Sequence, residues 1–484
     1  MINQHDLCMI HHHVIIYLND LDEQLTHIEK DFDMLSIGLM SGTSMDGIDA
    51  ALLETDGSAD VIKDLGHVSI SYDPRSKILL KAAEYAVRKH VGDMGKARSY
   101  YPQALRDYLG KELKMLEIDV SNKISELSIY LHGIEQLHSP ITLDEIIQHS
   151  TELHVVAVKK LLNKTGYEAT QIDVVGYHGQ TLFHRPSIKT SVIVGHGQYL
   201  ADQLGITVVD DFRSRDVAEG GQGAPFAPLY HQALAIRDKK IPVAIVNCGG
   251  IANITLIKNS NELDLIGFDP GPGNGLIDRL IRQRTQGKEN MDTDGQYGKN
   301  GQVNEQVLKA LYEKSLIKDG KNYFLTQPPK SLDIGDIELI SELDSLSIED
   351  ACATLEAFVA DTIINSLKLL DAELPPYWIL AGGGWHNPVI RHELENRLNK
   401  KFGKSVQVLT ADEAGWNSQA MEAQIFAYFA IRSLQNKPLS VPGTTGVPKP
   451  LSGGQAYLPN IGPTEAVKKL VQANIAVLSG YKEI

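Results

Sequence analysis

Short apolar segments alternate with turns of small polar residues along the first part of the chain. The apolar segments 35–40 and 48–54 flank seven residues, Ser-Gly-Thr-Ser-Met-Asp-Gly, at 41–47. Two such segments around a short turn of this composition predict a β-hairpin. A third strand is expected over 61–72, and the charged stretch 74–150 is predicted to be helical.

A further helix and a strand–helix–strand unit are predicted next. Apolar positions recur from Thr151 to Gly166, which predicts a helix with Thr151 as its N-cap and Gly166 as its C-terminal cap. The apolar segments 172–177 and 206–209 are expected to be strands on either side of a helix at 199–204. Because this spacing is typical of βαβ units, we predict that the two strands are parallel.

The second half of the chain repeats the order of elements predicted for the first half. Two apolar segments again flank a turn, here of Gly and Asn, and further strands and helices follow. These elements are strands at 243–247, 254–257, 265–268, 378–380 and 406–409, and helices that begin at Asn387 and span 418–434. The repetition predicts a duplicated α/β fold with two domains and a cleft between them.

Changes in composition set the expected domain boundaries. We predict a first domain over 34–235, with a helical insertion within 74–150, and a second domain over 236–435. Residues 1–33 are irregular and polar, and we expect them to form a poorly ordered extension. Residues 436–484 are expected to pack back on the cleft or on the first domain.

Composition and charge exclude several classes of protein. The 484 residues are 43% hydrophobic and 22% charged, which is typical of globular chains and excludes a disordered scaffold. A net charge of −15 gives no field that would attract nucleic acid or an anionic membrane surface. The cysteines Cys8, Cys248 and Cys352 form no C-x-x-C motif, and no apolar run approaches the roughly 18 residues of a spanning helix. We therefore expect a cytoplasmic protein.

Three turns carry groups that suit a nucleotide. In the turn 41–47, glycines allow a ligand to approach the backbone, N–H groups can bind an anion, and Asp46 would hold Mg²⁺ through water. The turn 247–253, Asn-Cys-Gly-Gly-Ile-Ala-Asn, occupies the equivalent point of the repeat. Residues 382–384, three glycines, lie between a predicted strand and a predicted helix, where nucleotides bind in open α/β folds. We predict that the first two turns bind a polyphosphate, whereas the glycine triplet is a candidate for the adenosine side, although such a triplet by itself is more often a loop.

Carboxylates beside a cation follow the strand predicted at 206–209. One of Asp210 and Asp211 is expected to face the cleft, near Arg213, as a general base for a water or a hydroxyl. The segments 178–181 and 220–225 are predicted to converge on the same strand ends. Together these residues would line a site for a polar sugar.

These motifs together resemble the anhydro-N-acetylmuramic acid kinase family, part of the superfamily of acetate and sugar kinases, Hsp70 and actin. The matching segments are 38–49, 177–181, 205–216, 220–225, 247–253, 267–274, 328–331 and 382–387, in family order. The segment 38–49 and the Asp-Phe-Arg sequence at 211–213 are highly specific, whereas the glycine triplet is not.

The resemblance implies a fold and a reaction. The fold is expected to be the duplicated actin-like ATPase (ribonuclease H-like) α/β fold. ATP and Mg²⁺ would act on 1,6-anhydro-N-acetylmuramic acid to give N-acetylmuramic acid 6-phosphate and ADP, in peptidoglycan recycling and amino-sugar catabolism. Asp211 would deprotonate the water that attacks the anomeric carbon, and the ether oxygen released would take the γ-phosphoryl group.

The resemblance also assigns binding residues. Those expected to bind ATP are Gly42, Thr43, Ser44, Met45, Asp46, Gly47, Ile48, Asp49, Asn247, Gly249, Gly250, Asn253, Gly382, Gly383, Gly384 and Asn387. Those expected to bind the sugar are Ser41, His178, Gly179, Gln180, Arg213, Gln222, Gly223 and Glu422. Homodimers are common in the family, but the sequence carries no interface signature.

The sequence departs from the family pattern at Pro270, Trp385 and His196, and after Ser331. We expect the first two departures to alter the fit of the nucleotide. Two alternative functions stay open. A kinase of the same fold could act on another anhydro-sugar of the levoglucosan type. A nucleotide-driven switch like actin and Hsp70 would turn over ATP slowly without sugar, but the segment around Asp211 argues against it.

Overall fold

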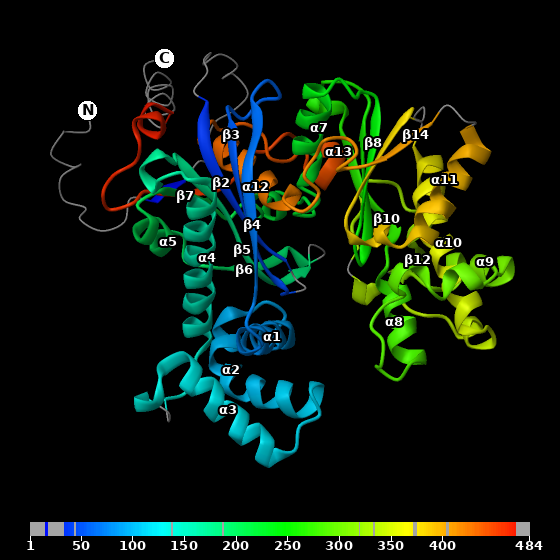
Figure 1. Cartoon of the computed structure of the whole chain (residues 1–484), viewed down its shortest axis with the longest axis horizontal. Helices are drawn as coiled ribbons and strands as arrows, with labels where there is room; N and C mark the ends of the chain where they lie inside the picture. Colours follow the sequence, from blue (N-terminus) through cyan, green and yellow to red (C-terminus); the bar gives the residue numbers. More distant parts are fainter. Residues whose placement is uncertain are drawn as a thin grey trace. The chain divides into compact units, whose positions relative to one another are not determined.

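The structure is a computed structural model of the chain (Figure 1). The residues that it describes are 15–17, 33–42, 45–136, 139–185, 188–318, 320–332, 334–370, 375–402 and 406–470. The chain divides into two compact units, each made of segments that are distant in sequence. Unit 1 comprises Met1–Gly223, Ala420–Leu439 and Leu451–Ile484, and unit 2 comprises Ala224–Gln419 and Ser440–Pro450.

Unit 1 is built on a sheet of strand order β1-β15-β7-β5-β2-β3-β4, with β6 paired to β5. The predicted hairpin is confirmed, because β2 and β3 pair antiparallel, and β4 continues the meander. The predicted βαβ unit is confirmed as well, because β5 and β7 are parallel and α5 connects them after β6. The bounds are β1 (Ile15–Tyr17), β2 (Met34–Ser41), β3 (Gly47–Thr55), β4 (Ile62–Ser71), β5 (Val174–Arg185), β6 (Thr190–Val194), α5 (Gly197–Leu204), β7 (Thr207–Asp210) and β15 (Gln455–Tyr457).

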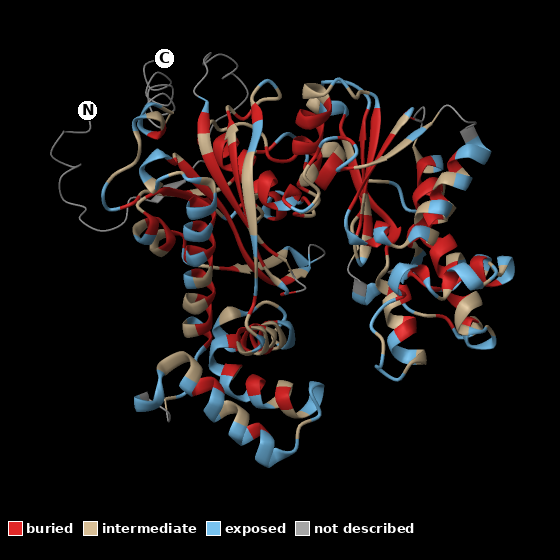
Figure 2. Ribbon diagram, viewed as in Figure 1, coloured by how far each residue is buried: buried red, intermediate tan, exposed pale blue. Residues whose placement is uncertain are grey.

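Unit 2 repeats this arrangement in a sheet of strand order β10-β9-β8-β13-β14. Its strands are β8 (Val243–Cys248), β9 (Ile251–Ile257), β10 (Ile266–Pro272), β13 (Tyr377–Ala381) and β14 (Gln407–Thr410). As in the series β4-β3-β2-β5-β7, an antiparallel meander is followed by two parallel strands. The predicted duplicated α/β fold is therefore confirmed, and each unit has a hydrophobic core of its own (Figure 2).

The stretch predicted to be a helical insertion is helical, and its helices lie together beyond one end of the unit 1 sheet (Figure 1). Its helices are α1 (Pro74–Lys89), α2 (Met94–Asp107), which continues into a π-helical turn (Tyr108–Glu112), and α3 (Glu117–His132).

Shorter strands and further helices complete the two units. They are α6 (Ser214–Ala218), α8 (Gly275–Arg284), α9 (Glu305–Lys314), β11 (Ile317–Lys318), β12 (Lys321–Asn322), α10 (Ile348–Ser366), α11 (Pro388–Phe402) and α13 (Pro442–Thr445), together with α4, α7 and α12, which are described below.

The helix predicted to begin at Thr151 begins earlier. Helix α4 spans Leu143–Thr165, and its N-cap is Thr142, whose hydroxyl accepts from the Glu145 amide while the Glu145 carboxylate accepts from the Thr142 amide. Thr151 lies inside the helix and donates to the carbonyl of Ile147, so the predicted N-cap is wrong. The predicted cap at Gly166 is confirmed, since its φ of 78° is left-handed.

In each unit, one helix packs on the sheet although it follows the last parallel strand of the other unit along the chain. Helix α7 (Ala227–Arg237) comes after β7 and α6 but packs on β9. Helix α12 (Met421–Leu434) comes after β14 but packs on β2, β3 and β5. The unit boundaries thus differ from the predicted ranges 34–235 and 236–435. The reason is that α12 is buried on all sides within unit 1: every residue of it except Glu422 is buried.

Two strand glycines allow this close packing of α12. A Cβ atom on Gly38 of β2 would lie 1.8 Å from the carbonyl oxygen of Ala423, and one on Gly176 of β5 would lie 1.9 Å from that of Phe426. Both neighbours are backbone atoms of α12, which cannot rotate away as a side chain can. The first residue of the 38–49 motif is therefore required by the packing of a helix on the sheet.

The ends of the chain are described only in part. Most of the predicted extension 1–33 and all of 471–484 lie outside the described residues, but Ile15–Tyr17 form β1, which pairs with β15. In the C-terminal segment, β15 also pairs with β7 in unit 1. None of the helices in the described part of the chain has both the length and the apolar character that crossing a membrane requires.

Candidate active site

The turn after β2 is anchored to unit 1 by buried side chains. The Gln180 amide nitrogen donates to the carbonyl of Gly42 at 2.9 Å, and its oxygen accepts from the Tyr72 hydroxyl at 3.2 Å. Met45 has a left-handed φ of 55° and a fully buried side chain, and its N–H donates to Gly42. Gln180 thus stabilises the turn, because both polar ends of its side chain are hydrogen-bonded within the protein. Thr43 and Ser44 lie outside the described residues.

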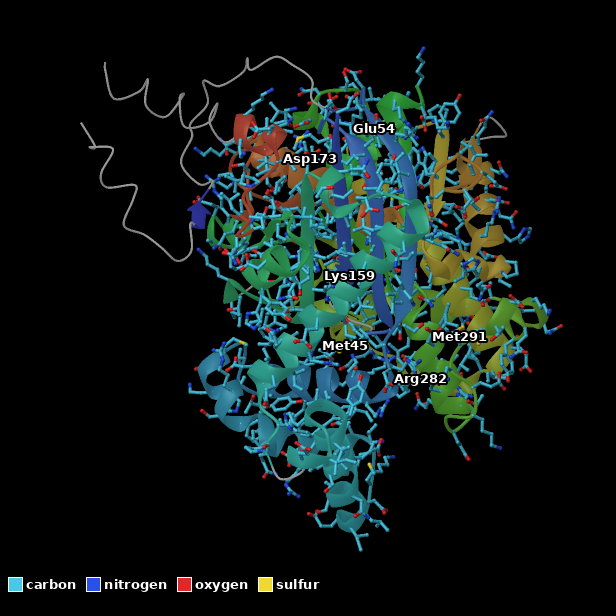
Figure 3. The ribbon with its side chains drawn as sticks, turned by 60° about the vertical axis from the view of Figure 1, so that its left-hand side comes forward. Met45, Glu54, Lys159, Asp173, Arg282 and Met291 are labelled. Carbon is cyan, nitrogen blue, oxygen red and sulfur yellow. The ribbon has the colours of Figure 1, made fainter. Side chains whose placement is uncertain are left out.

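Asp46 of this turn is paired with a lysine of the helical insertion. The Lys77 ammonium on α1 lies 2.6 Å from the Asp46 carboxylate, and both groups are exposed. Figure 3 shows Met45 at the end of the hairpin, next to the insertion. Sequence reasoning missed Lys77, because nothing in the stretch 74–150 distinguishes one lysine from another. The insertion therefore brings a cation to the predicted phosphate turn.

The two adjacent carboxylates after β7 differ in their surroundings. Asp211 has a left-handed φ of 52°, keeps an exposed side, and accepts a hydrogen bond from the Ser214 hydroxyl. Surrounding protein raises the pKa of Asp211, and the Ser214 hydrogen bonds oppose that shift. Burial raises the pKa of Asp210 well above its usual value, and its Oδ1 has no hydrogen-bond partner among the described residues. Asp211 is the carboxylate that a water molecule can reach.

Arg213 is positioned by a neutral histidine. Its Nε donates to His178 Nε2 at 3.0 Å, and its Nη1 donates to the carbonyl of Gly223 at 2.5 Å. His178 Nδ1 lies 3.0 Å from the carbonyl of Gly179, so that nitrogen must carry the proton and Nε2 must be the acceptor. Burial and Arg213 lower the pKa of His178 well below its usual value. Both ring nitrogens are thus used within the protein.

Ser41 is held in the same network. The Ser41 hydroxyl lies 3.0 Å from the carbonyl of Gly179 and 3.1 Å from His154 Nε2, and its side chain is buried. His154 Nδ1 lies 2.7 Å from the carbonyl of Ser150, and burial lowers the pKa of His154 to about 4. A chain of polar contacts therefore runs from α4 through Ser41 to His178 and Arg213. Ser41 was expected to bind the sugar, but its hydroxyl points into the protein.

The remaining predicted sugar residues of unit 1 lie in a loop and at the start of α12. Gly223 has a left-handed φ of 64°, and its N–H donates to the buried carboxylate of Asp216 at 2.6 Å; Gln222 precedes it, half-buried. Glu422 keeps an exposed side, while surrounding protein and then Asp49 raise its pKa and Arg213 lowers it. Arg213 is therefore near two carboxylates, Glu422 and Asp216.

Alanine in place of His178 should leave the Nε–H of Arg213 without its acceptor. Since hydrogen bonds to charged groups contribute about 1.5–3 kcal/mol, we expect KM for the sugar to rise at least about 10-fold. KM for ATP should change less than about 2-fold, as measured by coupled ADP release. His196→Ala is the matched control, because His196 is exposed at the start of α5. Equal rises in the two KM values would contradict this role for His178.

In unit 2, the turn after β8 is tied to the start of α8. The carbonyl of Gly249 accepts from the Asn274 amide at 2.9 Å, and that of Gly250 accepts from the amides of Gly273 and Gly275 at 3.0 and 3.2 Å. A Cβ on Gly273 would lie 1.9 Å from the Gly249 oxygen. The motif 267–274 therefore supports the predicted second phosphate turn directly, a link that spacing alone did not reveal. Asn247 and Asn253 face each other across the same hairpin.

The glycine triplet after β13 borders a pocket within unit 2. Gly382 has a left-handed φ of 90°, and a Cβ on Gly383 would meet no atom within 4 Å. The pocket has a cavity volume of about 110 Å³, and its lining residues are Asn274, Ile277, Asp278, Met291, Asp292, Thr293, Asp294, Gly383, Gly384, His386 and Asn387. Three predicted adenosine residues, Gly383, Gly384 and Asn387, are therefore brought together with residues of α8 and of the loop 291–294.

The pocket is rich in carboxylates that sequence reasoning missed. Burial raises the pKa of Asp278 to about 6, and Asn274 donates to it at 3.2 Å. No local motif marks Asp278, Asp292 or Asp294, because they come from a helix and a loop that precede the glycine triplet by 88 to 104 residues. Hydrogen-bond acceptors of this kind suit a ligand that presents several donors, such as hydroxyl and amino groups.

The departures at Pro270 and Trp385 do not line this pocket. Trp385 is buried, and its indole N–H donates to the carbonyl of Val246 at 3.0 Å. Pro270 lies in the irregularity of β10 between Phe268 and Gly271, where a residue without an N–H is tolerated. The expectation that these two residues alter nucleotide fit is therefore not supported by their placement. His196 is exposed at the N-terminus of α5.

The duplicated sheets, with a glycine turn at the first hairpin of each, place the chain in the class of actin-like ATPases and sugar kinases, as the sequence predicted. The family model for anhydro-N-acetylmuramic acid kinase matches residues 119–459. The chain belongs to the anhydro-N-acetylmuramic acid kinase family. The family resemblance and the expected enzyme class, a kinase, are thereby confirmed.

Two relatives agree with this assignment. An anhydro-N-acetylmuramic acid kinase from Rhizorhabdus wittichii is 39% identical over 426 residues, which are 88% of this chain and 99% of that protein. One from Methylorubrum populi is 38% identical over 421 residues, 87% of this chain and 97% of that protein. Among solved structures, a ROK family glucokinase from Streptomyces griseus, in complex with glucose and AMPPNP, covers 81% of this chain and 97% of its own at 12% identity and a TM-score of 0.34.

Proposed function

We propose that the protein is an ATP-dependent kinase that opens 1,6-anhydro-N-acetylmuramic acid by hydrolysis and phosphorylates the released 6-oxygen. The products are N-acetylmuramic acid 6-phosphate and ADP, in peptidoglycan recycling. One observation carries the proposal beyond family membership: Asp211 is a solvent-reachable carboxylate held in a left-handed conformation two residues before the positioned Arg213. Such backbone outliers cluster at functional sites.

The chemistry requires one base and one new phosphoryl acceptor. Asp211 takes a proton from a water molecule, and the water oxygen bonds to the anomeric carbon. The bond between that carbon and the bridging 6-oxygen breaks, and its electron pair bonds to the γ-phosphorus of ATP as ADP leaves. The raised pKa of Asp211 makes its carboxylate a stronger base near neutral pH. Arg213 and Glu422 are suited to hold polar groups of the sugar.

The nucleoside part of ATP is assigned to the pocket of unit 2. Ribose hydroxyls and the amino group of adenine are donors, which matches a lining of carboxylate and amide oxygens. The predicted phosphate turns, 41–47 and 247–253, would contribute backbone N–H groups to the phosphates. ATP is thus the co-substrate.

Magnesium is the metal that this reaction implies. Mg²⁺ is commonly held by one or two carboxylates together with substrate phosphates and several waters. Asp46 fits that pattern as a single exposed carboxylate on the first turn, provided that Lys77 releases it. The described residues hold no cluster of three or more His, Cys, Asp or Glu arranged for a metal. When bound, the ion would neutralise charge on the phosphates.

A comparison of sugars tests the proposal. ADP release by the purified protein with Mg-ATP would be measured with 1,6-anhydro-N-acetylmuramic acid, levoglucosan, N-acetylmuramic acid or no sugar. We expect turnover with the first sugar alone, because only it combines the anhydro bridge with the N-acetyl and lactyl groups. Turnover with levoglucosan would support the alternative anhydro-sugar kinase, and turnover independent of sugar would support the nucleotide switch. We further propose a cytoplasmic location, which fractionation of cells would test. We also propose that the protein is a homodimer, which size-exclusion chromatography would test.

A further inference from the structure

A buried carboxyl group lies behind the nucleotide pocket of unit 2. Glu356 is on α10, its side chain is 0% exposed, and its Oε1 accepts from the side-chain amide of Asn387 at 2.6 Å. Asn387 lines the pocket and follows the glycine triplet. The side-chain oxygen of Asn387 accepts from the Val389 amide at 2.9 Å, so the orientation of the whole amide group is fixed. Glu356 therefore supports one wall of the pocket.

The second oxygen of Glu356, Oε2, lies against the loop that holds Asp292, another residue of the same pocket. Asp292 lies within hydrogen-bonding reach of Glu356, and the two Asp292 oxygens accept from the amides of Tyr297 and Gly298 at 2.9 and 3.0 Å. A Cβ on Gly298 would lie 1.7 Å from Glu356 Oε2, so the loop is closed tightly over the carboxyl group. Asp292 also lines the pocket. Glu356 thus touches both walls.

The hydrogen-bond donors around Glu356 indicate the protonation state of its carboxyl group. As a carboxylate, Glu356 would have no donor for Oε2 among the described residues. It would also place a second buried negative charge against Asp292. As a neutral acid, Oε2–H donates to an Asp292 oxygen, and both arms of Glu356 are satisfied.

The surrounding charges favour the same state. The pKa of Glu356 is raised to about 9: burial is the largest cause, the hydrogen bond from Asn387 lowers the pKa, and Asp292 and Glu393 raise it. Glu393 comes from α11 and is itself paired with Arg397. Asp292 and Glu393 thus both oppose the ionisation of Glu356.

We propose that Glu356 is a positioning residue for nucleotide binding: a buried neutral carboxylic acid that accepts from Asn387 and donates to Asp292, and so fixes both pocket-lining side chains. The inference rests on the proposed assignment of this pocket to the nucleoside part of ATP. Because one proton holds the two walls together, loss of that proton should loosen the site. ATP affinity would then fall at alkaline pH, whereas the sugar-side residues of unit 1 would be unaffected.

Two substitutions and a pH series test this inference, with ATP binding measured directly by calorimetry in the absence of sugar. Glu356→Gln keeps an acceptor and a donor in the same shape, so its Kd for ATP at pH 7.5 should stay within about 3-fold of the wild-type value. Glu356→Leu removes both hydrogen bonds, so Asn387 keeps only its contact with Val389 and Asp292 only those with the backbone amides of its own loop. Its Kd should rise at least about 10-fold, the effect of losing one strong buried hydrogen bond.

The pH series separates positioning from folding. Between pH 7.5 and about 9.5, the wild-type protein should lose ATP affinity as Glu356 ionises, whereas Glu356→Gln should lose at least about 3-fold less. Glu393→Gln is the matched control, since it removes a nearby carboxylate that does not line the pocket, and it should keep the wild-type pH dependence. Parallel pH profiles for wild type and Glu356→Gln would overturn the inference even if Glu356→Leu fails to fold. Absence of ATP binding by the wild type would instead overturn the proposed function.

Discussion

Replacing Asp211 by Asn should lower sugar-dependent ADP release at least about 100-fold, the smaller effect expected when a general base is lost. The amide cannot accept the proton of the attacking water, yet it has the shape of the carboxylate and can keep a contact with Ser214. ATP binding should persist, because Asp211 lies in unit 1 and the proposed nucleoside pocket lies in unit 2. The measurement is steady-state ADP release with 1,6-anhydro-N-acetylmuramic acid, together with calorimetry for ATP.

The neighbouring aspartate provides the matched control. Asp210 is half-buried, and surrounding protein raises its pKa well above the usual value. Asp210→Asn keeps the shape of the side chain and an oxygen that can accept from Tyr457, so turnover should stay within about 5-fold of wild type. Near-normal turnover by Asp211→Asn would remove Asp211 from the role of base. Loss of turnover in the Asp210 variant alone would move that role to Asp210.

Replacing Gly38 by Ala should lower the free energy of unfolding by at least about 3 kcal/mol, the upper part of the range for overpacked cores. The added Cβ would lie 1.8 Å from the carbonyl oxygen of Ala423 and 2.4 Å from the amide nitrogen of Ala427. Both are backbone atoms, so α12 must move away from β2 as a whole. Urea unfolding followed by circular dichroism measures the change.

Gly95→Ala is the control for this experiment. Gly95 lies in the first turn of α2, where a Cβ would meet only a side-chain oxygen of Asp93 at 3.4 Å. Alanine is favoured over glycine in helices by up to about 1 kcal/mol, so this variant should be as stable as wild type or more so. If Gly38→Ala unfolds at the same urea concentration as Gly95→Ala, the close approach of α12 to β2 does not limit stability.

Helix α12, which packs closely on Gly38, also carries Glu422, a residue predicted to bind the sugar. Helix α12 begins with Met421 and Glu422, and Glu422 is near Arg213 and Asp49. A shift of α12 would therefore displace a predicted sugar ligand as well as loosen the core. This explains why a glycine without any polar group belongs to the motif 38–49.

The order and type of the elements were determined by the sequence itself. The hairpins, the βαβ unit and the repetition between the two halves follow from local alternation of apolar and polar residues, which depends on the pleat of a strand and the turn of a helix. The cap at Gly166 was predictable for the same local reason. The cap at Thr142 was not distinguished from Thr151, because both precede suitable apolar positions and only the full capping box with Glu145 decides between them.

The tertiary structure alone decided which side chains are ligands and which are supports. The motifs 38–49 and 177–181 contain the polar residues Ser41, His178 and Gln180. Their side chains are buried and contact other parts of unit 1, so we infer that they support the site rather than bind a ligand. The difference between Asp210 and Asp211 arises from packing around β7 and from a single left-handed residue. Lys77, the carboxylates of the pocket and Glu356 reach their places through contacts between distant segments. Local pattern sets the elements, whereas burial and charge at a site are properties of the packed fold.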